Sequence, residues 1–251
     1  MLRTVRMAIR QAFEEQRTFW RSAEYALFTF ALPIALLLLI GETTAGGYLQ
    51  HGHVKAIALF VPSIIAFGVI VASYVNLGSK LATLRHDGVL KRIRTTPLPS
   101  SAYLSGMLGS TLATTLAITG CTVLIGWAAF GTVPEVSGLL ELFIGLALGV
   151  ICFAALGLAL SSVLRSAESA TPVANASYLP VAIMSGIFDP TLTLPHWLNT
   201  VVGLLPVKAL AEILESSYTS AVPAPEPRDL LVLLAWAMAG AGITAWRFRW
   251  H

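Results

Sequence analysis

The chain has 251 residues, of which 56% are hydrophobic and only 12% are charged, and its mean hydropathy is +0.76. Soluble domains carry about 25% charged residues, so this composition excludes an ordinary soluble domain and indicates a membrane protein. The 16 basic and 13 acidic residues give a net charge of +3. In a membrane protein such a surplus orients the chain, and we infer no nucleic-acid partner from it.

Residues 1–22 precede the first long apolar segment and have the pattern of an amphipathic helix. Apolar side chains recur at helical spacing on one side. Five arginines line the other side: Arg3, Arg6, Arg10, Arg17 and Arg21. Such a helix lies in the membrane interface, where each Arg near an anionic surface contributes about 1 kcal/mol. We therefore expect an N-terminal interfacial helix on the cytoplasmic leaflet.

Six apolar segments follow, and each is long enough to cross a membrane. A spanning helix needs about 20 apolar residues, and hydrocarbon offers no partner to an unpaired backbone group. The predicted transmembrane helices are residues 23–40, 56–77, 103–130, 142–164, 170–188 and 230–246. The sequence therefore predicts an all-α membrane protein, with residues 1–251 forming a single transmembrane domain.

The connector between the second and third predicted spans, residues 80–101, is the most basic part of the chain. Its positive charges are Lys80, Arg85, Lys91, Arg92 and Arg94. Its apolar residues have helical spacing, and Thr96-Pro97 should end the helix, because proline lacks an N–H and disfavours helical geometry before it. Basic residues favour the cytoplasmic side. We expect this connector and both termini in the cytoplasm, with residues 41–55 and 189–228 outside.

The outer segment, residues 189–228, has too few charges in its first half for a solvated loop. Pro190, Pro195 and Pro206 divide that half into short pieces with an apolar face, which includes Trp197. Backbone that does not form a spanning helix is tolerated at membrane depth only where protein protects it. We therefore expect short re-entrant helices at the outer interface.

The sequence offers no sign of catalytic or cofactor chemistry. The phosphate-binding pattern GxxxxGK[ST] is absent, as are metal-ligand spacings such as HExxH and CxxC. The predicted spans are nearly free of ionisable residues, whereas ion-driven transporters carry carboxylates at membrane depth. We therefore expect no catalytic residue, no metal and no cofactor bound by this chain, and an energy source in another subunit.

Two motifs and the layout of the spans resemble a known family. Residues 87–99, DGVLKRIRTTPLP, are similar to its Gly-Thr-Leu-x-Arg-Leu-x-x-Thr-Pro-Leu segment, and residues 185–190, SGIFDP, followed by LPHWL at 194–198, resemble the end of its fifth span. The chain thus resembles the membrane-spanning permease of type-2 ATP-binding-cassette (ABC) exporters, which include bacterial drug and polyketide-antibiotic exporters. Val89 departs from the usual Thr, and Leu205 from a frequent Asn.

The resemblance implies a coupling helix that docks on a separate ABC ATPase, which binds ATP and Mg²⁺. The residues expected at this contact are Arg85, Asp87, Gly88, Lys91, Arg92, Arg94, Thr96 and Pro97. The resemblance also implies two permease chains, identical or different, around a path that is closed on the outside. The residues expected at this outer gate are Ser185, Gly186, Phe188, Pro190, Pro195, Trp197 and Pro206.

The function implied by the resemblance is export across the plasma membrane of a bacterium. A hydrophobic drug-like, antibiotic or lipid substrate is favoured, because only 9% of the residues are aromatic and a polysaccharide path should be lined by aromatic side chains. A polysaccharide or glycolipid exporter is the main alternative. A membrane-embedded lipid-modifying enzyme would need a catalytic constellation, and a channel or secondary transporter would need charge at membrane depth.

Overall fold

The computed structural model describes residues 2–44, 48–49, 54–89, 99–164, 166–189, 195–219 and 225–247. These residues form helices, apart from connecting turns and two short strands that pair antiparallel, β1 (Tyr48–Leu49) and β2 (Val54–Lys55). Within these ranges, five helical segments are long and apolar enough to cross a membrane, and a sixth is counted if one bent helix pair is a single span. The prediction of an all-α membrane protein is confirmed.

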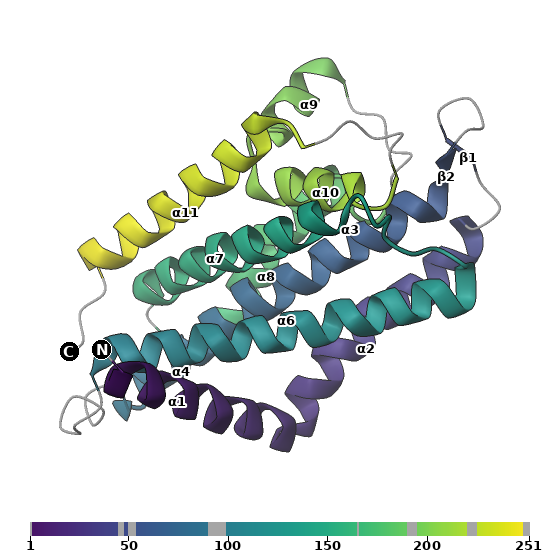
Figure 1. Cartoon of the computed structure of the whole chain (residues 1–251). Helices are drawn as coiled ribbons and strands as arrows, with labels where there is room; N and C mark the ends of the chain where they lie inside the picture. The colour runs from purple at the N-terminus through teal and green to yellow at the C-terminus, as the bar shows by residue number, and fades with distance from the viewer. Residues whose placement is uncertain are drawn as a thin grey trace.

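The long helices pack side by side, with α1 and α4 at one end of the molecule and α9 and the strand pair at the other (Figure 1). The helical elements are α1 (Leu2–Arg21), α2 (Ala23–Thr44), α3 (Ala56–Ile70), the π-helix η1 (Val71–Asn76), α4 (Leu77–His86), α6 (Ser100–Phe130), α7 (Leu139–Val163), α8 (Ala170–Met184), α9 (His196–Val202), α10 (Pro206–Ser216) and α11 (Pro227–Arg247).

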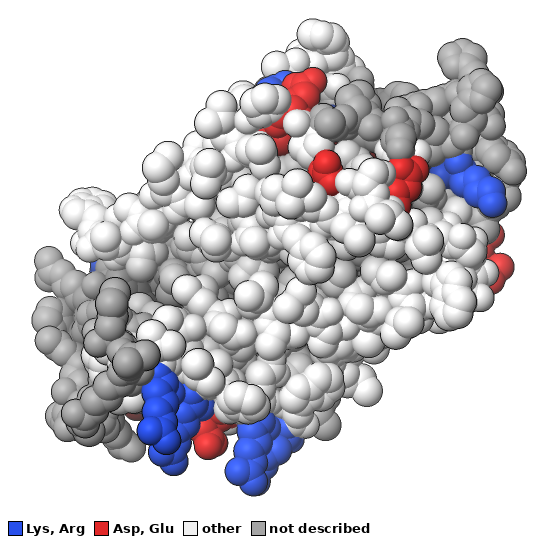
Figure 2. Space-filling model, in the orientation of Figure 1, with Lys and Arg blue, Asp and Glu red and all other residues white. Residues whose placement is uncertain are grey.

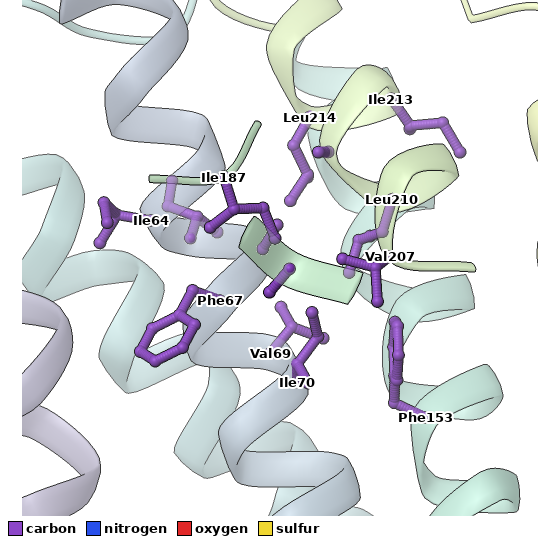
Figure 3. Close-up of a cluster of buried hydrophobic side chains, with 14 of the residues drawn as sticks. Ile64, Phe67, Val69, Ile70, Phe153, Ile187, Val207, Leu210, Ile213 and Leu214 are labelled. Carbon is purple, nitrogen blue, oxygen red and sulfur yellow. The ribbon is translucent and has the colours of Figure 1, made fainter. Parts of the chain in front are cut away.

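Helix α3 is the centre of the fold. All of its residues except Ala58 are buried, as expected of a helix that is apolar on every side. Figure 3 shows Ile64 and Phe67 of this helix in one cluster of buried side chains that also includes Leu210 of α10 and Phe153 of α7. The core therefore joins one spanning helix to another and to the short helix α10.

Helix α3 continues through η1 into α4, so that Ala56–His86 is one helical rod of 31 residues. The sequence predicts that this span ends at residue 77, but the helix extends further because Leu81 and Ala82 are buried against its neighbours. Packing thus prolongs the helix beyond the apolar segment. Helix α6 begins at Ser100 rather than at residue 103, which shortens the connector at both ends.

Helix α8 is shorter than the predicted fifth span, residues 170–188. It has 15 residues and rises about 22 Å, less than the ~30 Å hydrocarbon core. The helix ends in a Schellman turn, in which Gly186 has a φ of +80° and the N–H groups of Gly186 and Ile187 donate to carbonyls of the last helical turn. Glycine adopts this conformation without steric penalty, so hydropathy alone does not locate the helix end.

The outer segment contains α9 and α10, which meet at 89° and have 7 and 11 residues. Pro195 is the N-cap of α9 and Pro206 begins α10, near helix starts where an N–H has no intrahelical acceptor. Leu210 and Leu214 of α10 are fully buried, whereas Trp197 of α9 is 68% exposed. Two short helices in this segment agree with the predicted architecture, and neither crosses the membrane alone.

Charged side chains gather at the two ends of the molecule and leave a broad uncharged belt between them (Figure 2). The 31 residues of α6 include no charged side chain. The end that contains α1 carries mostly Lys and Arg, and the opposite end mostly Asp and Glu. A charge at the bilayer centre costs about 2.5 kcal/mol or more, so the belt marks the part of the molecule that fits within the membrane.

Helix α1 has three faces, where the sequence suggested two. One face packs on α6, where Gln11 lies against Gly106. The apolar face is open, with Val5, Ile9 and Phe13 exposed by 54, 55 and 74%. Arg6, Arg10, Arg17 and Arg21 are exposed and form the third face. An exposed apolar face beside a cationic one is typical of a helix in the membrane interface, and that location stays our expectation.

Candidate functional site

Helix α4 is the stem of the predicted ATPase contact. Arg85 lies in its last turn and Asp87 is its C-cap. Gly88 has a φ of +69°, and no atom of the described residues lies within 4 Å of the place where a Cβ would stand. Positive φ favours glycine, so the chain leaves the helix at an open position. Five further residues of the predicted contact lie outside the described residues: Lys91, Arg92, Arg94, Thr96 and Pro97.

Arg85 is engaged within the chain. Its Nη2 atom donates a hydrogen bond to the carbonyl oxygen of Leu164, at the C-terminal end of α7. The last carbonyls of a helix lack intrahelical partners and carry partial negative charge, which a guanidinium satisfies. Arg85 therefore ties the stem to α7, and the direct ATPase contact expected for it from the sequence stays a prediction.

The stem is also tied to α1 by an ion pair. Lys80 donates to the carboxylate of Glu15, whose side chain is 9% exposed. Gln11 Nε2 donates to the other oxygen of Glu15 at 2.9 Å. Gln16 Nε2 donates to the carbonyl oxygen of Ser110 on α6 at 2.8 Å. These bonds link α1, the stem and α6 at the basic end of the molecule.

The rod crosses α7 at short range where the stem begins. A Cβ at Gly78 would lie 3.1 Å from the carbonyl oxygen of Gly157, and a Cβ at Gly157 would lie 2.9 Å from that of Tyr74. Small residues allow such close approach of helices. Thr171 Oγ1 also donates to Ser79 Oγ at 3.0 Å, which joins α8 to the stem. The stem is thus connected to α1, α7 and α8 by specific contacts.

A groove of about 380 Å³ lies between α2, η1 and α8. Phe28, Leu32 and other apolar side chains form most of its wall, and polar groups interrupt it. Asn76 Nδ2 donates to Thr29 Oγ1 at 2.8 Å, and Asn175 lines the groove from α8. Small-molecule sites are mostly apolar clefts of about 300–1,000 Å³ with a few polar groups. The groove therefore has the size and chemistry to hold an amphipathic molecule.

A second groove, of about 430 Å³, lies on the other side of α8, between α7, α8, α10 and α11. Its wall is almost entirely apolar. Tyr178 lines both grooves, and its ring is 6.4 Å from that of Tyr74 at 82°. The Tyr74 hydroxyl and Ser177 Oγ are hydrogen bonded at 2.8 Å. An aromatic pair therefore separates the two grooves beside α8.

The structure places the predicted outer-gate residues at several positions between α8 and α10, and their role as a gate stays a prediction. The Phe188 ring lies 5.3 Å from the Phe67 ring in the core, Gly186 turns the chain after α8, and Trp197 is exposed on α9. Ser185 Oγ donates to the carbonyl oxygen of Val181 at 2.7 Å. Pro195 and Pro206 start helices, as described above, and Pro190 lies outside the described residues.

The sequence analysis missed both grooves and the π-helix. A signal was present, because Asn76 and Asn175 are amides within or next to apolar segments, where polar side chains are costly unless hydrogen bonded. The π-helix left no such signal, although segments of this type are frequent at functional sites. Among the described residues, no group of three or more His, Cys, Asp or Glu side chains is arranged to hold a metal ion.

The family of the chain follows from comparison with known proteins. The model of the ABC-2 type transporter family matches residues 11–218, from α1 through α10. The chain belongs to this family. Its members are transport subunits, so membership makes the chain a multi-pass permease and implies an ABC ATPase as its partner.

Two relatives agree with the family match. The chain is 26% identical over 204 residues to YvfS of Bacillus subtilis strain 168, which is named as a transport permease; the match covers 78% of this chain and 79% of YvfS. It is 28% identical over 185 residues to DrrB1 of Streptomyces coeruleorubidus, named as a daunorubicin resistance ABC transporter permease. That match covers 72% of this chain and 63% of DrrB1, less than two thirds of the relative.

The link between α1 and the stem predicts an energetic coupling between Lys80 and Glu15. Lys80→Met and Glu15→Gln should each lower the thermal unfolding midpoint, because each leaves a partly buried charge without its partner. The double variant should lose less stability than the sum of the two, with a coupling energy of about 1 kcal/mol. Glu14→Gln, at an exposed position on the same helix, is the matched control. Strict additivity of the two single effects would contradict the link.

Proposed function

We propose that the chain is the membrane-spanning subunit of an ABC exporter in the plasma membrane of a bacterium. A separate ATPase binds and hydrolyses ATP with Mg²⁺, and this chain carries no catalytic residue. The substrate is a hydrophobic drug-like, antibiotic or lipid molecule. The observation that carries the proposal is the stem α4, which ends in an open glycine turn and is bonded to three other helices.

The proposed coupling is mechanical. A force applied to the chain after Gly88 acts on a stem that is tied to α1 through Lys80, to α7 through Arg85 and to α8 through Ser79. Because α4 is continuous with η1 and α3, the same force reaches the centre of the membrane domain. Rigid helical elements couple two distant sites when events at each site shift the arrangement of the same helices.

The coupling proposal predicts that a bulky residue at Gly88 uncouples transport. Gly88→Trp should leave the helices folded, since no described residue lies within 4 Å of a Cβ at this position, but should obstruct close approach of the ATPase. Export should fall by about tenfold or more, equivalent to about 1.4 kcal/mol of lost coupling, while ATPase activity persists. The measurement is export and ATP hydrolysis by the reconstituted complex in vesicles. The charge reversal Arg92→Glu with Arg94→Glu should act in the same direction.

The control for this experiment is Gly131→Trp. Gly131 also has a positive φ, +64°, and no described residue lies within 4 Å of a Cβ there. It follows the C-terminal end of α6, whereas the connector from the stem leads to the N-terminal end of that helix. It therefore introduces the same backbone strain away from the proposed contact. If both tryptophan variants lose export equally, strain rather than docking explains the loss. If Gly88→Trp assembles with the ATPase and exports normally, the stem does not transmit the stroke.

We propose that the substrate passes along the groove between α2, η1 and α8, facing a second permease chain. Support comes from the exposed apolar residues of α2 beside the groove, including Phe28 at 69% exposure. An apolar surface of this kind would be unfavourable in contact with water, and within a membrane it faces either lipid or another chain. The name of DrrB1 supports a hydrophobic antibiotic as substrate class, so daunorubicin is a reasonable first probe.

The groove proposal predicts a substrate defect when its polar lining is removed. Asn175→Leu should raise the daunorubicin concentration that gives half-maximal stimulation of the ATPase by about 2- to 10-fold. This is the effect expected from one lost hydrogen bond. Val173→Leu, on the same helix but outside the groove lining, should have no effect. Equal responses of the two variants and the wild type would exclude this lining as a substrate contact.

The charge distribution predicts the orientation of the chain. Cations at one end belong to α1, α4 and the last turn of α11 (Figure 1): Arg6, Arg10, Arg17, Arg21, Lys80, Arg85 and Arg247. Acids at the other end belong to the end of α2, the start of α7, the turn after α8, α10 and the start of α11 (Figure 1), and they include Glu42, Glu141, Asp189, Glu212 and Asp229. By the preference of Lys and Arg for the cytoplasm, Asp87→Cys should be labelled only from inside and Glu226→Cys only from outside, in a background with Cys121 and Cys152 replaced by Ser. Labelling of Asp87→Cys in intact cells would reverse the assignment.

A further inference from the structure

A polar cavity of about 190 Å³ lies at the acidic end of the molecule, where α3, the turn after α8, α9 and α10 meet. Its charged lining consists of Asp189, Lys208, Glu212 and Glu215. Lys208 donates to the Asn199 side chain and lies 3.8 Å from Glu212. Three carboxyl groups thus share the cavity with one ammonium group. Like charges at close range favour the neutral form of a carboxyl group.

Glu215 contacts the central helix through Ser63, which is fully buried. Ser63 Oγ lies 2.9 Å from the carbonyl oxygen of Leu59 and 2.8 Å from Glu215 Oε1. A hydroxyl group has one hydrogen, and the Leu59 carbonyl is only an acceptor. If Glu215 were ionised, both neighbours would compete for that hydrogen. A protonated Glu215 resolves the competition, because it donates to Ser63 Oγ while Ser63 donates to Leu59.

We propose that Glu215 is a proton-binding site, and that its neutral carboxyl group latches the outer helix α10 to the central helix α3. The latch closes when the proton is bound and loosens when it is lost. The polar cavity gives the carboxyl group access to protons, so the latch responds to the pH on that side of the membrane. This site is independent of the proposed ATPase contact, which lies at the other end of the rod.

The surroundings of Glu215 support a neutral carboxyl group. Burial, together with the nearby charge of Glu212, raises the pKa of Glu215 to about 7, although the Ser63 contact and Lys208 oppose the shift. The remaining elements packed on α10 contribute Glu141, Arg228 and Asp229, none of which lines the cavity. Ionisation of Glu215 would place a negative charge beside the fully buried Ser63. The residue that α3 contributes to the lining of the cavity, Leu59, has an apolar side chain and cannot stabilise this charge.

The latch lies within a contact that already joins the two helices. Leu210 and Leu214 of α10 belong to the same buried cluster as Ile64 of α3 (Figure 3). Leu214 is next to Glu215 in the sequence, and Ile64 is next to Ser63. Loss of the proton therefore weakens one bond of an apolar contact and leaves the rest in place. The expected change is local opening of α10, with the spanning helices intact.

The test is hydrogen exchange of α10 peptides in the full chain, held in lipid nanodiscs, from about pH 5 to 8.5 and corrected for intrinsic exchange. The folded-state pKa is above the value of about 4.3 for free Glu, so protection is complete at low pH. It should fall by up to about tenfold per pH unit between about pH 5 and 7 and level off above the folded pKa. Peptides from α7 should show no such step.

Two variants separate the latch from general pH effects. Glu215→Gln keeps a donor for Ser63 without a titrating proton, so α10 should stay protected at pH 8.5. Glu226→Gln, at an exposed position before α11, should keep the wild-type profile. If the protection of α10 in the wild type does not change with pH, that result alone overturns the proposal. A pH step that persists in folded Glu215→Gln would assign the proton to another group.

Discussion

The burial of α3 is the constraint on which the rest of the structure depends. A helix with apolar side chains on every side has no face for water, and here the other helices enclose it almost completely. Its backbone hydrogen bonds are internal, which hydrocarbon surroundings require. The spanning helices α2, α6 and α7 and the short outer helix α10 all take their positions from contact with this one element.

The same element links the two ends of the molecule. At 31 residues, the rod from α3 to α4 is about 46 Å long, longer than the ~30 Å hydrocarbon core. Its basic end carries Lys80 and Arg85, which bond to α1 and α7, and its other end carries Ser63, which meets α10. One continuous helical rod thus contacts other helices at both ends of the molecule, which is the kind of rigid element through which distant sites can be coupled.

The π-helix η1 is the irregular part of this rod, and it lies beside the groove that we assign to substrate. Helix α8 borders both that groove and the apolar one on its other side, and with 15 residues it is shorter than the helical segment found at any other predicted span. An element with a cavity on each flank has fewer packing contacts to hold it than one enclosed by the core. The grooves leave the sides of α8 loosely packed, whereas its N-terminal end is bonded to the stem through Thr171 and Ser79, next to the close crossing of Gly78 and Gly157.

The sequence by itself determined the class of the protein, because the absence of charge over long apolar segments leaves a helical membrane domain as the available fold. It also located the short outer helices through Pro195 and Pro206, and its motifs indicated the permease family. Tertiary structure decided the helix ends and the site. Hydropathy did not show that α4 continues to His86, that Gly186 stops α8, or that Arg85 caps α7. These depend on packing, on positive φ and on bonds between residues far apart in the chain, which local patterns of polarity do not contain.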